Sequence, residues 1–266
     1  MSSVVDISWW QLGLFSMLLA IPLAVNTYHQ LDIGKEMLWS VARMALQLLL
    51  VGIYLEYLFA HNNLWVNLAW LMVMIGVGAS SIVSKAKLPV KLLIGPIIAG
   101  LAVGLFPLII LLCVAVVQPT PWYSAQYMIP LAGMLLGNSL SGNIVALQNL
   151  FTAYKERRSE YEGALSLGAS PIYASRGFVR SALRKASAPL LASMAATGLV
   201  TLPGMMTGQI LGGTSPLIAI KYQLLIMIAI FVMMNISLTL SVHLTLRVAL
   251  SKEGRVKVRF TDENSE

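Results

Sequence analysis

The chain has 266 residues, of which 58% are hydrophobic and only 11% are charged, and its formal net charge is +7. Soluble domains average about a quarter charged residues, so this composition excludes an ordinary soluble globular protein and predicts an integral membrane protein. The single cysteine, Cys113, lies inside an apolar run and rules out an intrachain disulfide.

Apolar stretches long enough to cross the bilayer, about 20 residues each, predict the fold class. We expect an all-α, polytopic membrane protein with about seven transmembrane helices. We expect residues 1–250 to form one transmembrane domain and residues 251–266 to form a polar cytoplasmic tail. The expected spans are 8–27, 38–60, 64–84, 91–117, 128–149, 187–207 and 217–246.

The basic residues predict the orientation of these spans, because Lys and Arg near span ends stay on the cytoplasmic side. All but one of the 18 lie in or beside alternate connections, at 28–37, 85–90, 150–186 and after 246, and the exception is Lys221. We therefore expect the N-terminus outside, the C-terminus inside, and a multi-pass protein of the plasma (inner) membrane. The positive charge then faces anionic lipid, and no nucleic-acid partner is expected.

The connection at 150–186 is long and charged in a chain whose other connections are short. Good helix formers over 152–167 predict a helix that ends at Gly168. Ser170 and Pro171 then predict the start of a second helix. On this second helix the arginines at 176, 180 and 184 form one basic ridge. A loop that only rests on the inner leaflet would also explain these charges.

The stretch "EYEGALSLGASP", residues 160–171, resembles the coupling loop of ABC-transporter membrane subunits. That loop has an acidic residue, two small residues and a glycine four positions later, and it fits a groove on an ATPase. Gly163 replaces the usual first alanine, and "RS" at 180–181 stands where importers have "LP". The resemblance assigns ATPase coupling to Glu162, Gly163, Ala164, Gly168, Ala169, Ser170 and Pro171.

A phosphate-binding G-x-x-x-x-G-K-[ST] loop is missing from the sequence; the nearest stretch, "GNSLSGN", ends in asparagine instead of lysine. We therefore expect no catalytic residue and no cofactor in this chain. ATP and Mg²⁺ would bind to a separate ABC ATPase subunit. Since such transporters have two ATPase sites and two membrane halves, this chain would form a homodimer.

Several blocks, "LWSVARMALQLLLVGIYLEYLF", "IPLAGMLLGNSL", "LSLGASP" and "TGLVTLPGMMTGQILGGTSPLIAIKYQ", resemble the FetB-type family of bacterial permeases. The resemblance covers residues 37–247. It implies a permease that works with a separately encoded ATPase. The family is implicated in iron export, and its plant relatives are aluminium-tolerance transporter subunits, also associated with nucleotide-sugar movement.

Polar residues within the spans are candidates for the translocation path, because such residues are costly in hydrocarbon and usually face a cavity or a partner helix. Each has a structural alternative. Arg43 is shallow enough to reach the inner surface, and Glu56 can pair with Lys221. Asn138 and Ser141 can join helices at a dimer seam. The candidates are Arg43, Gln47, Glu56, Asn138, Ser141 and Lys221.

The run "LPGMMTGQILGG" predicts that the sixth span breaks before it reaches the outer surface. It adds Pro203, Gly204, Met205, Met206 and Gln209 to the candidate path. Thioethers favour Cu(I) over iron, and adjacent helical positions face different directions, so no metal site is assigned.

Two functions compete at this point. The first is the membrane subunit of an ABC transporter that exports iron or another metal. The second is a secondary transporter or channel that works without an ATPase.

Overall fold

The protein is described by a computed structural model that covers residues 6–258. Among these residues the regular elements are helices, and β-pairing is limited to two isolated bridges. The expected all-α fold is confirmed. The helices are α1 (Trp9–Ser16), η1 (Met17–Leu19), α2 (Ala20–Tyr28), α3 (Gly34–His61), α4 (Leu64–Lys85), α5 (Val90–Leu111), η2 (Leu112–Val117), α6 (Ala125–Glu156), α7 (Arg158–Ser166), α8 (Pro171–Ala174), α9 (Arg176–Ala196), α10 (Gly204–Leu211) and α11 (Pro216–Ala249).

Six of the seven expected spans are confirmed as helical segments long and apolar enough to cross a membrane within residues 6–258. The expected span at 187–207 is wrong as a single helix. Helix α9 begins earlier, at Arg176, and ends at Ala196; α10 begins only at Gly204. Gly198 is left-handed, with φ +91°, and Pro203 immediately precedes α10, so the backbone turns out of the helix as expected.

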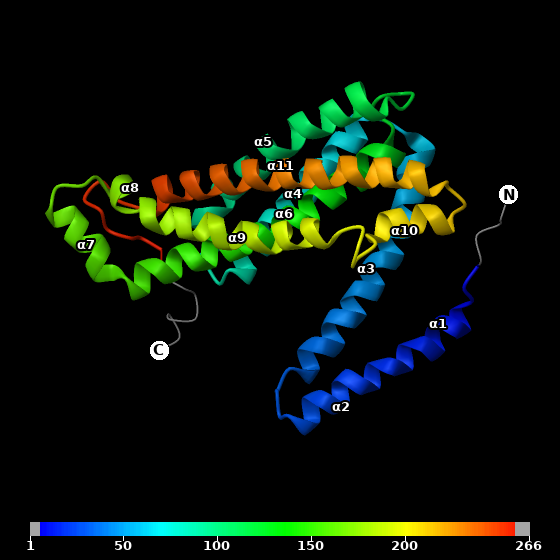
Figure 1. Ribbon diagram of the computed structural model, residues 1–266, viewed down its shortest axis with the longest axis horizontal. Coiled ribbons are helices and arrows are strands. Elements are labelled where there is room, and N and C mark those ends of the chain that lie inside the picture. Colours follow the sequence, from blue (N-terminus) through cyan, green and yellow to red (C-terminus); the bar gives the residue numbers. More distant parts are fainter. Residues whose placement is uncertain (1–5, 259–266) are drawn as a thin grey trace.

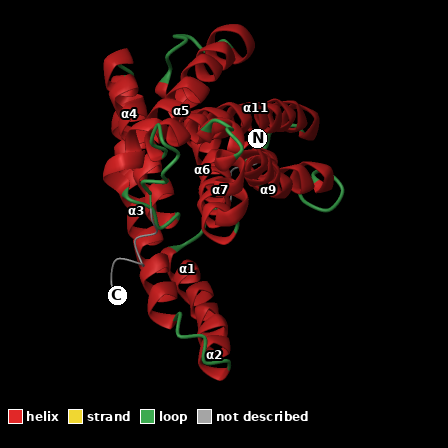
Figure 2. Cartoon of the chain, turned by 90° about the vertical axis from the view of Figure 1, so that its left-hand side faces the viewer, coloured by secondary structure: helices red, strands yellow, loops and turns green. Residues whose placement is uncertain are grey.

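Helices α4, α5, α6, α9 and α11 form one elongated body (Figures 1 and 2). Helix α11 packs against α5 and α6, and α6 also packs against α4 and α9. The crossing of α5 and α11 is close because Gly100 has no side chain. A Cβ built there would lie 2.3 Å from Ser241 Oγ and 2.9 Å from the Ser241 backbone nitrogen.

Helices α1, α2 and most of α3 diverge from this body (Figure 2). The most apolar windows of the first two spans are 0% buried. Only the last turns of α3 join the body, where Leu58 packs with Ala125 and Ile129 of α6. The space between α3 and α6 is therefore open over much of its length.

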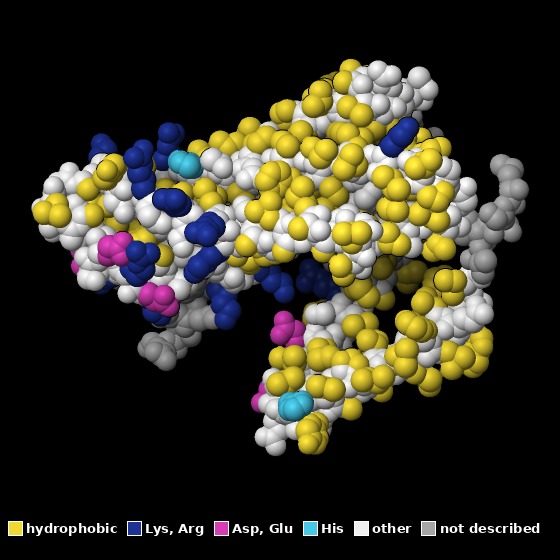
Figure 3. All heavy atoms as spheres, in the orientation of Figure 1, with side chains coloured by type: hydrophobic (Ala, Val, Ile, Leu, Met, Phe, Trp, Pro, Cys, Tyr) yellow, Lys and Arg dark blue, Asp and Glu magenta, His cyan; other side chains and the backbone are white. Residues whose placement is uncertain are grey.

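The two ends of the body differ in charge. Helices α7 and α8 lie at one end and α10 at the other (Figure 1). In the same orientation, most of the visible Lys and Arg side chains gather at the α7 end (Figure 3). The predicted basic ridge of Arg176, Arg180 and Arg184 is exposed on α9 near this end.

Candidate functional site

The predicted helix, glycine and second helix are present with different bounds, and the second helix is divided at Ser175 into α8 and α9. Helix α6 continues to Glu156, and a break at Arg157 separates it from α7. Gly168 then adopts φ +88°, and its N–H donates to the Leu165 carbonyl, which closes the end of α7. Ser170 caps α8 by accepting a hydrogen bond from the Tyr173 N–H at 3.3 Å.

One exposed side of α7 carries paired charges and little side-chain bulk. Arg158 Nε donates to Glu162 Oε1 at 2.7 Å, and both side chains remain more than half exposed. A Cβ built at Gly163 or Gly168 would meet nothing within 4 Å. This side of α7 therefore leaves room for another chain to approach the backbone.

Three large apolar side chains project beside these glycines, and the sequence reasoning did not select them. Leu167 is 91% exposed, Tyr173 61% and Ile172 52%. The signal that could have found them is the presence of apolar residues on both sides of Gly168 in a polar connection. We call the exposed residues within 162–173 the elbow surface. It combines exposed apolar groups, open glycines and a surface ion pair.

The inner side of α7 is held by aromatic residues. Tyr161 is 3% exposed, and its ring meets that of Tyr154 edge-on, with centroids 5.1 Å apart. The Tyr154 ring in turn meets Phe178 of α9 at 5.2 Å, and its hydroxyl is hydrogen-bonded to Ser175 Oγ. Burial raises the pKa of the Tyr161 phenol above its ordinary value. The elbow is thus anchored to both α6 and α9.

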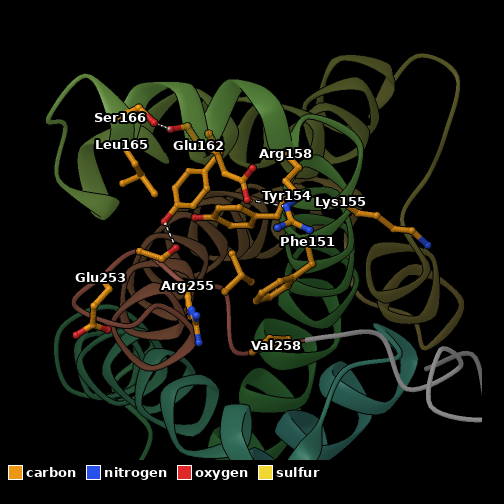
Figure 4. Close-up of a pocket in the computed structure, with 13 residues that line it drawn as sticks. Phe151, Tyr154, Lys155, Arg158, Glu162, Leu165, Ser166, Glu253, Arg255 and Val258 are labelled. Carbon is orange, nitrogen blue, oxygen red and sulfur yellow. Dashed lines mark hydrogen bonds and ion pairs between the residues drawn. The ribbon is translucent and has the colours of Figure 1, made fainter.

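A cavity of about 1010 Å³ lies between the end of α6, α7 and residues 253–258 (Figure 4). Its charged lining carries both signs: Lys155, Arg158, Glu162, Glu253 and Arg255. The sequence assigned residues after 250 to a separate polar tail. In the structure, the part of that tail up to Val258 forms a wall of this cavity.

The candidate path residues on α3 are not brought together with those of other helices. Arg43, Gln47 and Glu56 are all exposed on α3. Lys221, near the start of α11, is exposed as well, and no ion pair joins it to Glu56 in the described structure. These two charges therefore do not neutralise each other within one chain in this conformation.

Asn138 and Ser141 lie on one exposed face of α6, beside the open position Gly137. The Asn138 Nδ2 group donates to the Met134 carbonyl of its own helix at 2.8 Å. The Asn138 side-chain oxygen remains available on this face, so α6 presents polar groups where its neighbours within the chain leave it uncovered.

The candidate path residues that the sequence assigned to the break in the sixth span lie at the start of α10. Pro203 caps this helix and Gly204 is its first residue. Met205 packs against the main core, which favours a packing role for it. The Oε1 atom of Gln209 is buried without a hydrogen-bond partner. No group of three or more His, Cys, Asp or Glu side chains within residues 6–258 is placed to hold a metal ion.

Comparison with known proteins places the chain in a family. The profile of the Uncharacterised protein family (UPF0014) matches residues 9–250, and the chain belongs to this family. It is 34% identical to a UPF0014 membrane protein of Synechocystis, over 86% of this chain and 89% of that protein. It is 35% identical to Protein ALUMINUM SENSITIVE 3 of Arabidopsis thaliana, over 81% and 77%.

A third relative is the Probable iron export permease protein FetB of Escherichia coli, which is 32% identical over 81% of this chain and 82% of that protein. These relatives confirm the predicted FetB-type resemblance. No solved structure gives a significant match.

Proposed function

We propose that this UPF0014 chain is the membrane-spanning permease subunit of an ABC transporter that exports iron or another metal. A separate ATPase, which binds ATP and Mg²⁺, docks on the elbow surface. The observation that carries the proposal is the exposure of Leu167, Ile172 and Tyr173 beside open glycines at the charged end of the body. Apolar groups on a polar, projecting surface are typical of an interaction site.

The charge distribution supports a cytoplasmic position for the elbow surface. Lys and Arg gather around α7 and α9 (Figure 3), and such residues are retained on the cytoplasmic side. We therefore propose that the N-terminus lies outside and the C-terminus inside the plasma (inner) membrane. The exposed ridge at Arg176, Arg180 and Arg184 then faces anionic lipid headgroups at the inner surface.

Exposed polar groups on membrane-spanning helices support a homodimer. Arg43 and Gln47 on α3, and Asn138 and Ser141 on α6, are uncovered within one chain. Polar groups within membrane spans are costly when they face lipid, so a second copy or a water-filled path is expected to cover these faces. The path would run between two copies and pass the α9–α10 break, where Gln209 lacks a partner.

The role of iron rests on the relative named as a probable iron export permease. For this chain, the substrate is assigned by measuring metal efflux from cells that express it together with its ATPase.

The test of ATPase docking compares two separate variants, each with a leucine replaced by aspartate. Burial of one Leu side chain contributes about 1.5–3 kcal/mol, so Leu167→Asp is expected to weaken ATPase binding by about tenfold or more. Leu31→Asp is the matched control, because Leu31 is also exposed and lies in another connection on the same proposed side. Unchanged ATPase binding by Leu167→Asp, or transport by the chain alone without ATP, would instead favour a secondary transporter or channel.

A further inference from the structure

The segment after α11 turns back on itself as a short hairpin. Its ends are joined by the Lys257 N–H, which donates to the Ala249 carbonyl at 2.7 Å, and by a bridge between Leu250 and Val256. At its turn, the Ser251 N–H donates to the Arg255 carbonyl at 2.9 Å. We call residues 251–258 the C-terminal hairpin. These hydrogen bonds fix its shape relative to the end of α11.

The C-terminal hairpin contacts α7 through buried groups. The Tyr161 hydroxyl donates to the Gly254 carbonyl at 2.9 Å, and this bond is buried. Gly254 is itself buried, with φ +84°, and a Cβ built there would lie 2.5 Å from Leu165 Cδ1. Val258 is only 5% exposed and belongs to the main core. The positive φ favours a glycine at 254, and any larger residue there would also require the Leu165 side chain to move.

The hairpin contact is one of the few that hold α7 against the rest of the chain. It is short and polar, and its neighbours in the chain are α6 and α8, which it meets at its ends. Its two inward side chains, Tyr161 and Leu165, line the cavity that the hairpin closes on the other side (Figure 4). The hairpin therefore adds a second contact on this side of α7, beside the packing of the Tyr161 ring against Tyr154.

We infer that the C-terminal hairpin ties the elbow surface to α11, with Tyr161, Leu165 and Gly254 as positioning residues. The inference rests on the proposed function. When an ATPase displaces α7, the displacement passes to α11 through the hairpin, in addition to its direct route into α6. The hairpin contributes no docking group of its own, so its loss affects coupling and not ATPase binding.

The first experiment measures amide hydrogen exchange in the full-length chain. Removal of the hydroxyl in Tyr161→Phe deletes one buried hydrogen bond, and exchange of the α7 amides is expected to rise about fivefold. Gly254→Val should raise it further, since a β-branched residue is disfavoured at positive φ and would displace Leu165. The amides of α4 should not change. Lys252→Ala, at an exposed position of the same hairpin, is the control.

The second experiment separates coupling from docking in the complex with the ATPase, assembled in lipid nanodiscs. Gly254→Val should retain ATPase binding within about twofold and lose at least about half of the permease-dependent change in ATP hydrolysis. Tyr161→Phe should show a smaller loss of the same kind, which a general folding defect would not produce at intact binding. If Gly254→Val unfolds the chain, Tyr161→Phe decides the outcome.

Wild-type exchange in α7 and wild-type ATP hydrolysis in both variants would overturn the inference. Lost binding in Gly254→Val would also overturn it, because the hairpin would then be part of the docking site. Failure of the wild-type chain to bind any ABC ATPase would overturn the proposed function, and the exchange experiment would still report whether the hairpin holds α7.

Discussion

The crossing of α5 and α11 gives a sharp test of the packing of the body, through Gly100→Ala. A Cβ at this position would lie 2.3 Å from Ser241 Oγ, 2.9 Å from the Ser241 backbone nitrogen and 3.1 Å from the Ser237 carbonyl oxygen. Two of these three atoms belong to the backbone of α11 and cannot rotate away. The two helices must therefore separate to admit one methyl group.

The cost follows from a comparison with a second glycine. Overpacking of a tight core costs about 1–3 kcal/mol, and Ala is favoured over Gly inside a helix by about 1 kcal/mol. Gly76→Ala in α4 has the same propensity gain, and its new Cβ meets nothing within 4 Å. The difference between the free energies of unfolding of the two variants therefore cancels the gain in helix propensity. Gly100→Ala should therefore be less stable than Gly76→Ala by about 1–3 kcal/mol.

The assay is unfolding of the purified protein in mixed micelles by titration with a denaturing detergent. Ser241→Ala removes the Oγ contact and leaves the backbone contacts, so it should restore only part of the stability lost by Gly100→Ala. Equal stability of Gly100→Ala and Gly76→Ala would refute the close crossing of α5 and α11.

Three further substitutions test polar contacts. The buried Asn67 amide donates to a backbone carbonyl at 2.8 Å, and Asn67→Ala should lower the free energy of unfolding by about 1–3 kcal/mol, seen as a lower thermal midpoint. The Asn143 amide donates to Ser237 Oγ at 3.2 Å, between α6 and α11. Asn143→Ala should lower the free energy of unfolding by a similar amount and raise amide hydrogen exchange in both helices. Arg158→Ala removes an exposed ion pair, and because such pairs contribute about 0–1 kcal/mol, the thermal midpoint should stay the same within error. A large drop in the thermal midpoint would contradict the surface position of this pair.

Hydropathy predicted most of the fold because the membrane thickness fixes the length of a span. Hydropathy gave the wrong helix bounds where a helix passes from a polar to an apolar environment along its length. Helix α9 begins as the basic ridge at Arg176 and continues into the apolar stretch past Ser187 without a break. A window of mean hydropathy starts the span where charge ends, whereas the backbone hydrogen bonds of a helix continue across that boundary. The same reason explains why α6 extends past residue 149 to Glu156.

Local signals predicted the outline of the elbow surface, because a left-handed glycine and a Ser-Pro start act within a few residues. The hairpin contact could not be predicted in this way. Tyr161 and Gly254 are 93 residues apart, and the acceptor is a backbone carbonyl, which every residue has. The exposed state of Leu167 is also a property of the packed structure, since an apolar side chain in a loop is as often buried.

Helix α6 joins the two parts of the site that the sequence left separate. It is 32 residues long, about 48 Å at helical rise, and it remains one helix although Pro130 lies within it. Tyr154 near its end packs against Tyr161 of α7, while Ser141 and Asn138 lie on its exposed face, Ser141 about 20 Å further along. Because α6 is also held by α4, α9 and α11 along its length, it is expected to move as a rigid rod. A displacement of the elbow surface by a docked ATPase would therefore reach α6 across the break at Arg157, through the packing of Tyr161 on Tyr154, and would tilt the polar face of α6 as a unit.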